Sequence, residues 1–370
     1  MTINNEHNKL NVPNLRFKEF QGEWEKCKLS EICTFFSGGT PSSSNKYFYG
    51  GDIAFIRSGE LHADNTELFI TQAGFDSSSA KIVEVGDLLL AMYGATSGDI
   101  AISKIEGAIN QAILCIRTKQ NKKFLESIWN KHVSKILRKY LQGGQGNLSA
   151  DIVKSISFSF PTLEEQERIA NLISLLDERI ATQNKIIDKL QSLIKGITQK
   201  IVCSNKPNVR LLECLECKSS TLQESDVCEH GTYPVYGANG IVGYLDNYNT
   251  EGEAVYIIKD GSGVGTVSYV TGKCSATGTL NTLQAKDGYS LQYLYYLLKV
   301  FCFEPYKTGM AIPHIYFKDY GKAKVFCPSY TEQLQYARFL SAIDNKLSAE
   351  QHILTNLSLQ KQYLLRQMFI

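Results

Sequence analysis

The sequence lacks the features that mark several large classes of protein. No apolar run approaches the ~20 residues that a membrane-spanning helix needs. No Gly-x-x-x-x-Gly-Lys-Ser/Thr phosphate loop occurs, and the six histidines are scattered and form no ligand cluster. The net charge is only +2 and the pI is about 7.9, below the value of about 9 that is usual for a nucleic-acid-binding domain. Any such function must therefore depend on local patches.

The ten cysteines do not form a disulfide pattern, because their spacing is irregular. The start, "MTINNEHNKLN", is polar and Asn-rich and predicts no secretory signal, so we expect reduced thiols and a cytoplasmic location. The only compact pair is Cys214-x-x-Cys217, with Cys203 and Cys228 nearby, whereas structural zinc needs four ligands at close spacing. Packing as small buried apolar side chains is the simpler interpretation, and we expect no metal.

Length and composition indicate a globular chain with more than one core. Hydrophobic residues make up 43% of the 370 positions, aromatic residues 11% and charged residues 21%. These values exclude a disordered or highly charged chain. The length exceeds that of a typical single domain, so two domains are the first expectation.

A long helix is written twice in this sequence. "PTLEEQERIANLISLLDERI" begins at Pro161 and "PSYTEQLQYARFLSAIDNKL" at Pro328, which is 328 − 161 = 167 positions later. Each copy has Thr or Ser after the Pro and Glu three residues further on, which predicts a capping box. Ungapped identities between residues 161–202 and 328–369 are Pro161/Pro328, Glu165/Glu332, Gln166/Gln333, Ala170/Ala337, Ser174/Ser341, Asp177/Asp344, Ile186/Ile353 and Leu190/Leu357.

Both copies carry a heptad seam in which steps of four and three residues alternate. Its main polar interruptions, Gln183 and Glu350, fall at equivalent positions. The first seam consists of Ile169, Ile173, Leu176, Ile180, Gln183, Ile187, Leu190, Ile194, Ile197 and Ile201. The second consists of Tyr336, Leu340, Ile343, Leu347, Glu350, Leu354, Leu357, Lys361, Leu364 and Met368.

Two apolar stripes of this length must be buried against a partner. The chain leaves the first helix, forms a domain and returns, so an antiparallel pair of the two helices is the simplest arrangement. Packing on unrelated surfaces or on other chains is the alternative.

Each helix follows a β-rich region. "DIAFIRS", "DLLLAMYG", "DIAIS" and "AINQAILCIR" predict strands in the first region, and "YPVYGANGIVGYL", "EAVYIIKDG", "TVSYV" and "CSATGTLNTLQ" in the second. Helical stretches follow at about 122–141 and 290–303. We therefore expect an α+β fold with two β-rich domains, two long helices that form an antiparallel coiled coil, and an internal pseudo-two-fold repeat. The predicted segments are a leader at 1–22, domains at 23–160 and 204–327, and helices at 161–203 and 328–370.

Several motifs occur in the order typical of one family. They are "VPNLRFKEFQGEW" from Val12, "GGTPS" from Gly38, "GDLLLAMYGAT" from Gly86, "YPVYGANGIVGYL" from Tyr233 and both "P-x-x-x-E-Q" helix starts. Over essentially its whole length the chain resembles the specificity subunit of type I restriction-modification systems. The resemblance implies that the two β-rich domains are target-recognition domains, each reading half of a bipartite, asymmetric site in double-stranded DNA.

In that family the catalytic chemistry belongs to the partners. The resemblance implies two methyltransferase (modification) subunits docked on the helices, which use S-adenosylmethionine for adenine-N6 methylation. It also implies restriction/translocase subunits that use ATP and Mg, and it implies no cofactor on this chain. The sequence contains no Asn/Asp-Pro-Pro-Tyr/Phe stretch, which an adenine methyltransferase would carry. We therefore expect a non-catalytic subunit; the alternatives are a self-contained DNA methyltransferase or nuclease with fused recognition domains, and a coiled-coil adaptor that does not contact DNA.

The loops of both domains supply side chains that match base edges and phosphates. In the first domain the candidates are Ser43, Asn45, Lys46, Arg57, Tyr93, Thr96, Ser97, Asn110, Gln111, Gln145 and Asn147. In the second they are Tyr236, Asn239, Lys259, Asn281, Lys307, Thr308 and His314.

A basic helix face precedes the Gln145 loop and would suit phosphate contacts, although a solvated surface is an equal alternative. It comprises Lys122, Lys123, Lys131, Lys135, Arg138 and Lys139.

Overall fold

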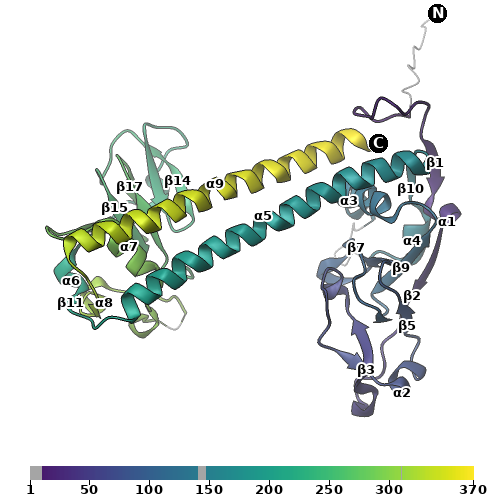
Figure 1. Ribbon diagram of the computed structural model, residues 1–370, viewed down its shortest axis with the longest axis horizontal. Helices are drawn as coiled ribbons and strands as arrows, with labels where there is room; N and C mark the ends of the chain where they lie inside the picture. The colour runs from purple at the N-terminus through teal and green to yellow at the C-terminus, as the bar shows by residue number, and fades with distance from the viewer. Residues whose placement is uncertain (1–10, 141–146, 310) are drawn as a thin grey trace, which may run out of the picture. The chain divides into compact units, whose positions relative to one another are not determined.

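The computed structural model describes residues 11–140, 147–309 and 311–370. The chain divides into two compact units. Unit 1 contains the chain up to Thr182 together with Leu354–Ile370, and unit 2 contains Gln183–Ile353. Figure 1 labels the elements of both units.

Unit 1 is built on two four-stranded sheets. The first has the order β2 (Cys33–Ser37), β9 (Ile113–Thr118), β6 (Leu88–Ala91) and β7 (Ile100–Ile102). The second has the order β4 (Phe69–Ile70), β3 (Tyr49–Ile56), β8 (Gly107–Ile109) and β5 (Lys81–Val83). A separate antiparallel pair joins β1 (Glu25–Lys28) to β10 (Ser157–Phe160). The helices are α1 (Leu29–Ile32), α2 (Gln72–Asp76), α3 (Lys122–Tyr140) and α4 (Ala150–Ser155).

Unit 2 repeats this plan. Its larger sheet has the order β12 (Leu215–Ser219), β18 (Leu280–Ala285), β15 (Ala254–Ile258) and β16 (Val267–Val270). Its smaller sheet has the order β14 (Gly240–Leu245), β13 (Tyr233–Gly237) and β17 (Ser275–Ala276). β11 (Val209–Arg210) pairs with β19 (Lys324–Val325). The helices are α6 (Leu211–Cys214), α7 (Leu291–Val300) and α8 (Phe317–Tyr320).

The turn that opens "GDLL" in unit 1 has a counterpart in unit 2. Gly86 precedes β6 and Gly252 precedes β15, and their φ angles are 91° and 82°. A positive φ favours glycine, which explains why this residue type stands at both turns.

The two long helices are α5 (Leu163–Cys203) and α9 (Tyr330–Met368), and each contributes to both units. Within unit 1 Asp177 forms an ion pair with Lys361, and within unit 2 Gln183 hydrogen-bonds to Glu350. Moving forward along α5 therefore moves backward along α9, which is the direction that the predicted antiparallel pairing requires. All twenty predicted seam positions are buried or half-buried.

A buried glutamine clamps the start of each long helix. Gln166 Nε2 donates to Pro161 O (2.9 Å), and its Oε1 accepts from Asn121 N, which precedes α3 (3.1 Å). In unit 2 the counterpart Gln333 Nε2 donates to Pro328 O (2.9 Å), and its Oε1 accepts from Ser290 N, the residue that caps α7 (2.9 Å). The "P-x-x-x-E-Q" motif thus joins each long helix to the domain helix that precedes it.

The predicted capping boxes form only in part. In α5, Glu165 N donates to Thr162 Oγ1 (3.4 Å), but the Glu165 carboxylate binds the Arg16 guanidinium of the leader instead of a backbone N–H. In α9, the Glu332 carboxylate accepts from Ser329 N (3.0 Å), but Glu332 N does not donate to Ser329 Oγ in return. The prediction of a reciprocal box was wrong at α5, because a leader residue distant in sequence provides a stronger, charge-assisted partner for Glu165.

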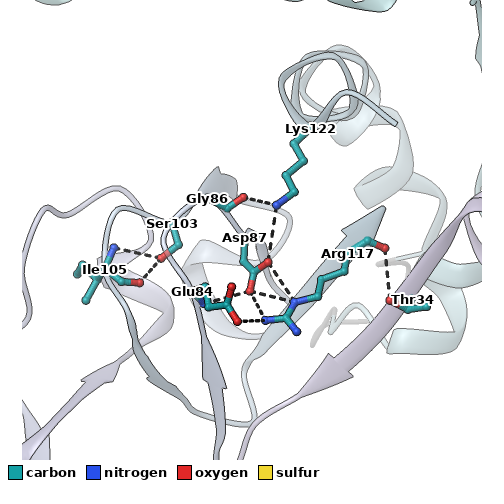
Figure 2. Close-up of polar contacts among 8 residues, drawn as sticks. All are labelled: Thr34, Glu84, Gly86, Asp87, Ser103, Ile105, Arg117 and Lys122. Carbon is teal, nitrogen blue, oxygen red and sulfur yellow. Dashed lines mark hydrogen bonds and ion pairs between the residues drawn. The ribbon is translucent and has the colours of Figure 1, made fainter. Parts of the chain in front are cut away.

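The "GDLL" aspartate differs between the two halves. In unit 1 Asp87 is buried, and Figure 2 shows it between Arg117 and Lys122. Arg117 Nη2 lies 2.7 Å from its carboxylate, and Glu84 N donates to it over 3.1 Å. Burial alone would raise the pKa of Asp87, but these hydrogen bonds outweigh it and hold the pKa below its ordinary value. The counterpart Glu253 is exposed, so only unit 1 fixes this turn with a buried ion pair.

The main core of unit 1 includes residues from both ends of the described chain. Trp24 and Phe124 pack with Phe369, whose ring centroid lies 5.1 Å from that of Phe124. Lys131 and His132 of α3 bind the backbone carbonyls of Phe369 and Ile370. Phe369 and Ile370, which follow α9, thus contribute to the core of unit 1.

Candidate nucleic-acid interface

Arg57 and Asn110 meet at one edge of the second sheet in unit 1. β3 and β8 are parallel, with Ile56 opposite Ile109, and each candidate is the next residue in its strand's direction. Carboxyl ends of parallel strands lie at the same edge, so Arg57, Asn110 and Gln111 leave the sheet side by side. Gln111 is exposed, and Asn110 is half-buried, with Oδ1 accepting from Ala112 N (3.1 Å).

The first sheet of unit 1 ends at the same place. Met92 N donates to Ala112 O (2.8 Å), and Leu148 N donates to Met92 O (2.9 Å). These bonds bring the candidates Tyr93 and Asn147, both exposed, next to Gln111. Thr96 and Ser97 belong to the turn after Tyr93, and Ser97 Oγ donates to Met92 O (3.0 Å). We call this meeting point of two sheets and the Asn147 segment the junction of unit 1.

Unit 2 contains the same junction at the same offset. Lys259 N donates to Thr279 O (3.0 Å), and Ile315 N donates to Lys259 O (2.9 Å). The offsets from Met92, Ala112 and Leu148 are 259 − 92, 279 − 112 and 315 − 148, which are each 167. The repeat therefore preserves these backbone contacts.

The candidates of unit 2 lie around that junction. β13 and β17 are parallel, with Tyr236 opposite Ala276, and Thr277 N donates to Tyr236 O (2.9 Å). Asn239 is exposed in the β13–β14 turn. His314 is the counterpart of Asn147, and its backbone exchanges hydrogen bonds with Thr308 (2.8 and 2.9 Å). Lys307 forms an ion pair with Glu304.

The Ser43, Asn45 and Lys46 loop is attached to the junction of unit 1. Gly39 N donates to Ile109 O (3.2 Å), and Thr40 Oγ1 donates to Gln111 Oε1. A Cβ at Gly38 would lie 1.7 Å from Ile109 O, so the "GGTPS" motif needs glycine for this close approach. Ser43 and Lys46 are exposed, whereas Asn45 caps a short 3-10 helix, η1 (Lys46–Phe48).

Two candidates do not extend this surface. Asn281 is buried in β18 at 3% exposure, and its Oδ1 accepts from Ser219 Oγ (2.8 Å). No base edge can reach that side chain in this conformation, so we leave Asn281 out of the interface. Gln145 lies outside the described residues.

Arg57 already has one partner at the junction. Its guanidinium binds Glu60 through Nε (3.2 Å) and Nη2 (2.7 Å), and these bonds lower the pKa of Glu60. An arginine carries five N–H donors, so an edge of the guanidinium stays available for guanine. Glu60 therefore orients Arg57 rather than blocking it.

The predicted basic face of α3 is divided by the structure. Lys122, Lys123 and Lys131 bind internal groups: the Asp87 turn, Glu126 with Asp177, and Phe369 O. Lys135, Arg138 and Lys139 are exposed at the end of α3 that leads toward Asn147. Lys135 and Lys139, together with Lys26 of β1, line a cavity of ≈ 490 Å³. Only this second half of the face is free for phosphate.

The cysteine pair does not form a compact cluster of ligands. Within residues 11–140, 147–309 and 311–370, no group of three or more His, Cys, Asp or Glu side chains could hold a metal ion. Cys214 Sγ instead lies 4.0 Å from Cys327 Sγ in the core of unit 2. In the same parts of the chain, every helix is too short or too polar to cross a membrane.

Two structural residues were not predicted from the sequence. Met92 acts through its backbone, which has no sequence signal, although the offset of 167 pairs it with the predicted Lys259. Asp87 belongs to the "GDLLLAMYGAT" motif, but its partner Arg117 is thirty positions away and has no fixed spacing to it.

Comparison with known proteins identifies the family of the chain. The family model for the "Type I restriction modification DNA specificity domain" matches the chain twice, at residues 21–192 and 208–359. The chain belongs to this family. Its two matched segments together cover most of both units.

Relatives are similar over different shares of their length. The type I restriction enzyme MjaIX specificity subunit of Methanocaldococcus jannaschii is 28% identical over 45% of this chain and 42% of the relative. The EcoprrI specificity subunit of Escherichia coli is 22% identical over 87% of this chain and 88% of the relative. For the first relatives, the matched part of this chain spans less than half of their length.

The fold is also that of a solved structure. The S subunit of a type I restriction-modification system from M. genitalium superposes with a TM-score of 0.70 at 18% identity, covering 97% of this chain and 99% of that one. At this identity, the likeness concerns the fold alone.

Proposed function

We propose that this specificity-family chain reads a bipartite, asymmetric site in double-stranded DNA, with each unit reading one half. The observation that carries the proposal is the repetition of the junction. The same three backbone positions meet in both units at an offset of 167, and the side chains around them differ. A repeated backbone arrangement that carries different side chains suits two domains that recognise different DNA sequences.

The side chains at each junction have the chemistry that base edges require. Unit 1 offers Arg57 for guanine and Asn110, Gln111 and Asn147 for adenine. Unit 2 offers Lys259, Asn239, Thr308 and His314. Lys135, Arg138 and Lys139, which are exposed near the end of α3, would contact phosphates of the half-site read by unit 1.

Two copies of a modification subunit would dock on the long helices. Exposed apolar side chains recur at repeat-equivalent positions there. Leu163 and Tyr330 are 56% and 50% exposed, and Ile186 and Ile353 are 37% and 40% exposed. Because both pairs are separated by 167 positions, two identical partners could each find a similar contact.

Methylation and cleavage would be carried out by the partners. In this proposal the modification subunits bind S-adenosylmethionine and methylate adenine N6, and the restriction/translocase subunits bind ATP and Mg. This chain would contribute recognition and assembly, with no cofactor of its own.

The test is methylation of genomic DNA by the purified chain with and without its cognate modification subunit, read by single-molecule sequencing. We expect a single bipartite adenine-methylated motif only when both proteins are present. Methylation by this chain alone would support a self-contained enzyme. No bipartite motif with the active partner would contradict DNA reading.

A further inference from the structure

Tyr47 is a large aromatic side chain that the fold leaves almost entirely in solvent. It is 88% exposed, the highest fraction among the exposed large hydrophobic residues of the described chain. Within residues 11–140, 147–309 and 311–370 its hydroxyl has no hydrogen-bond partner and its ring no aromatic neighbour. The side chain therefore contributes little to folding, which leaves its ring free for a ligand.

The backbone of Tyr47 is nevertheless held firmly. Tyr47 N donates to Asn45 Oδ1 (3.1 Å), and Tyr47 O accepts from Thr71 Oγ1 (2.9 Å). The next residue, Phe48, lies against α2, where a Cβ at Gly74 would come within 2.4 Å of Phe48 O. Contacts on both sides fix the backbone of Tyr47, so binding would have to order only the side chain and not the loop.

The loop that presents Tyr47 is attached to the junction of unit 1. Its first residues contact Ile109 and Gln111, as described above. Tyr49 Oη donates to Pro41 O (2.7 Å), which ties the two ends of the loop together. Lys46, beside Tyr47, is exposed and positively charged. An apolar ring beside a cation is the combination that packs on a nucleotide, with the ring on the base or sugar and the cation on the phosphate.

We propose that Tyr47 packs its ring against a base or deoxyribose of the half-site bound by unit 1. The proposal rests on the function proposed above. In this proposal the Tyr47 ring makes the apolar contact and the neighbouring Lys46 makes the polar contact to phosphate. DNA is favoured over a protein partner because the loop is linked to Gln111 of the junction, whereas the exposed apolar pairs for protein docking lie on α5 and α9.

The test compares Tyr47→Ala and Tyr47→Phe with the wild type in the full complex with modification subunits. Affinity is measured at one fixed salt concentration for a duplex that contains the bipartite motif identified by the methylation experiment. We expect Tyr47→Ala to weaken binding by about tenfold or more, as for a lost aromatic stack, and Tyr47→Phe to bind like the wild type. Val85→Ala is the matched control: Val85 is 65% exposed in unit 1 but lies before β6, at the end opposite Tyr93.

The outcomes separate this proposal from the proposed function. If the wild-type complex methylates a bipartite motif and Tyr47→Ala binds it unchanged, the Tyr47 proposal alone is overturned. If Tyr47→Phe loses as much affinity for the duplex as Tyr47→Ala, the hydroxyl and not the ring makes the contact. That result would also overturn the Tyr47 proposal. If Tyr47→Ala no longer assembles with the modification subunits on size-exclusion chromatography, Tyr47 contacts a protein instead of DNA, and the proposal is overturned. If the wild type methylates no bipartite motif, the proposed function itself fails.

Discussion

Gln183 and Glu350 are repeat counterparts that bind each other. Gln183 Nε2 donates to Glu350 O over 3.1 Å and also to the Glu350 carboxylate, inside the helix seam of unit 2. A residue that contacts its own counterpart marks a local two-fold relation between α5 and α9. Polar seam residues of this kind fix register at a cost in stability.

We expect Gln183→Leu to destabilise the protein by about 1–3 kcal/mol, because it leaves the buried Glu350 without one of its partners. Gln183→Leu combined with Glu350→Leu should recover most or all of the loss, since an apolar pair fits the seam. Urea unfolding followed by circular dichroism measures both. If the double variant is as unstable as Gln183→Leu alone, the loss does not come from leaving Glu350 without a hydrogen-bond partner, and this explanation is wrong.

The glutamine clamps should contribute equally to both units. Gln166→Leu and Gln333→Leu each leave the carbonyl of a half-buried Pro and a backbone N–H unpaired, so we expect each to cost about 1–3 kcal/mol. Gln191→Leu, at an exposed position of α5, should change stability by less than about 0.5 kcal/mol. Thermal unfolding of the three variants provides the comparison, and equal effects in all three would contradict a specific role for the clamps.

Asp87 should make unit 1 sensitive to acid. Its pKa is lower in the folded chain than in the unfolded chain, so its contribution is present above the unfolded value of about 4 and is lost as pH falls through the folded value. We expect Asp87→Asn to be less stable than the wild type at neutral pH, with the difference shrinking below about pH 4. Unfolding midpoints across pH measure this. Glu253→Gln, at the exposed counterpart, should show no such trend.

Variants at the two junctions should affect different halves of the DNA site. We expect Asn147→Ala to weaken or relax only the half read by unit 1, and His314→Ala only the other half, by about 1–3 kcal/mol each. Methylation of a library randomised in one half-site at a time measures both effects. Asn171→Ala, exposed on α5, is the control. A uniform loss over unrelated sequences would argue for phosphate contacts rather than base reading.

The sequence predicted the elements well where periodicity was long or repeated. The proline and heptad patterns predicted α5 and α9 to within two residues at each end. Long amphipathic patterns are reliable because burial of one face overrides local propensity.

Contacts between distant residues could not be predicted in the same way. Glu165 carries the spacing of a capping box, but Arg16 of the leader binds it, and no local pattern reports a partner 149 positions away. Asn281 looked like a base reader because it is an amide in a polar stretch. β18 lies between β12 and β15, and its residues from Leu280 to Leu283 are all buried, so Asn281 lies in the interior.

Phe369 has a consequence for how this polypeptide is made. Its ring is 2% exposed and fills part of the core of unit 1 beside Phe124. During translation, most of unit 1 emerges from the ribosome long before Phe369 is made, so its hydrophobic centre stays open until then. Unit 2, which ends at Ile353, is therefore synthesised in full before unit 1 gains this part of its core.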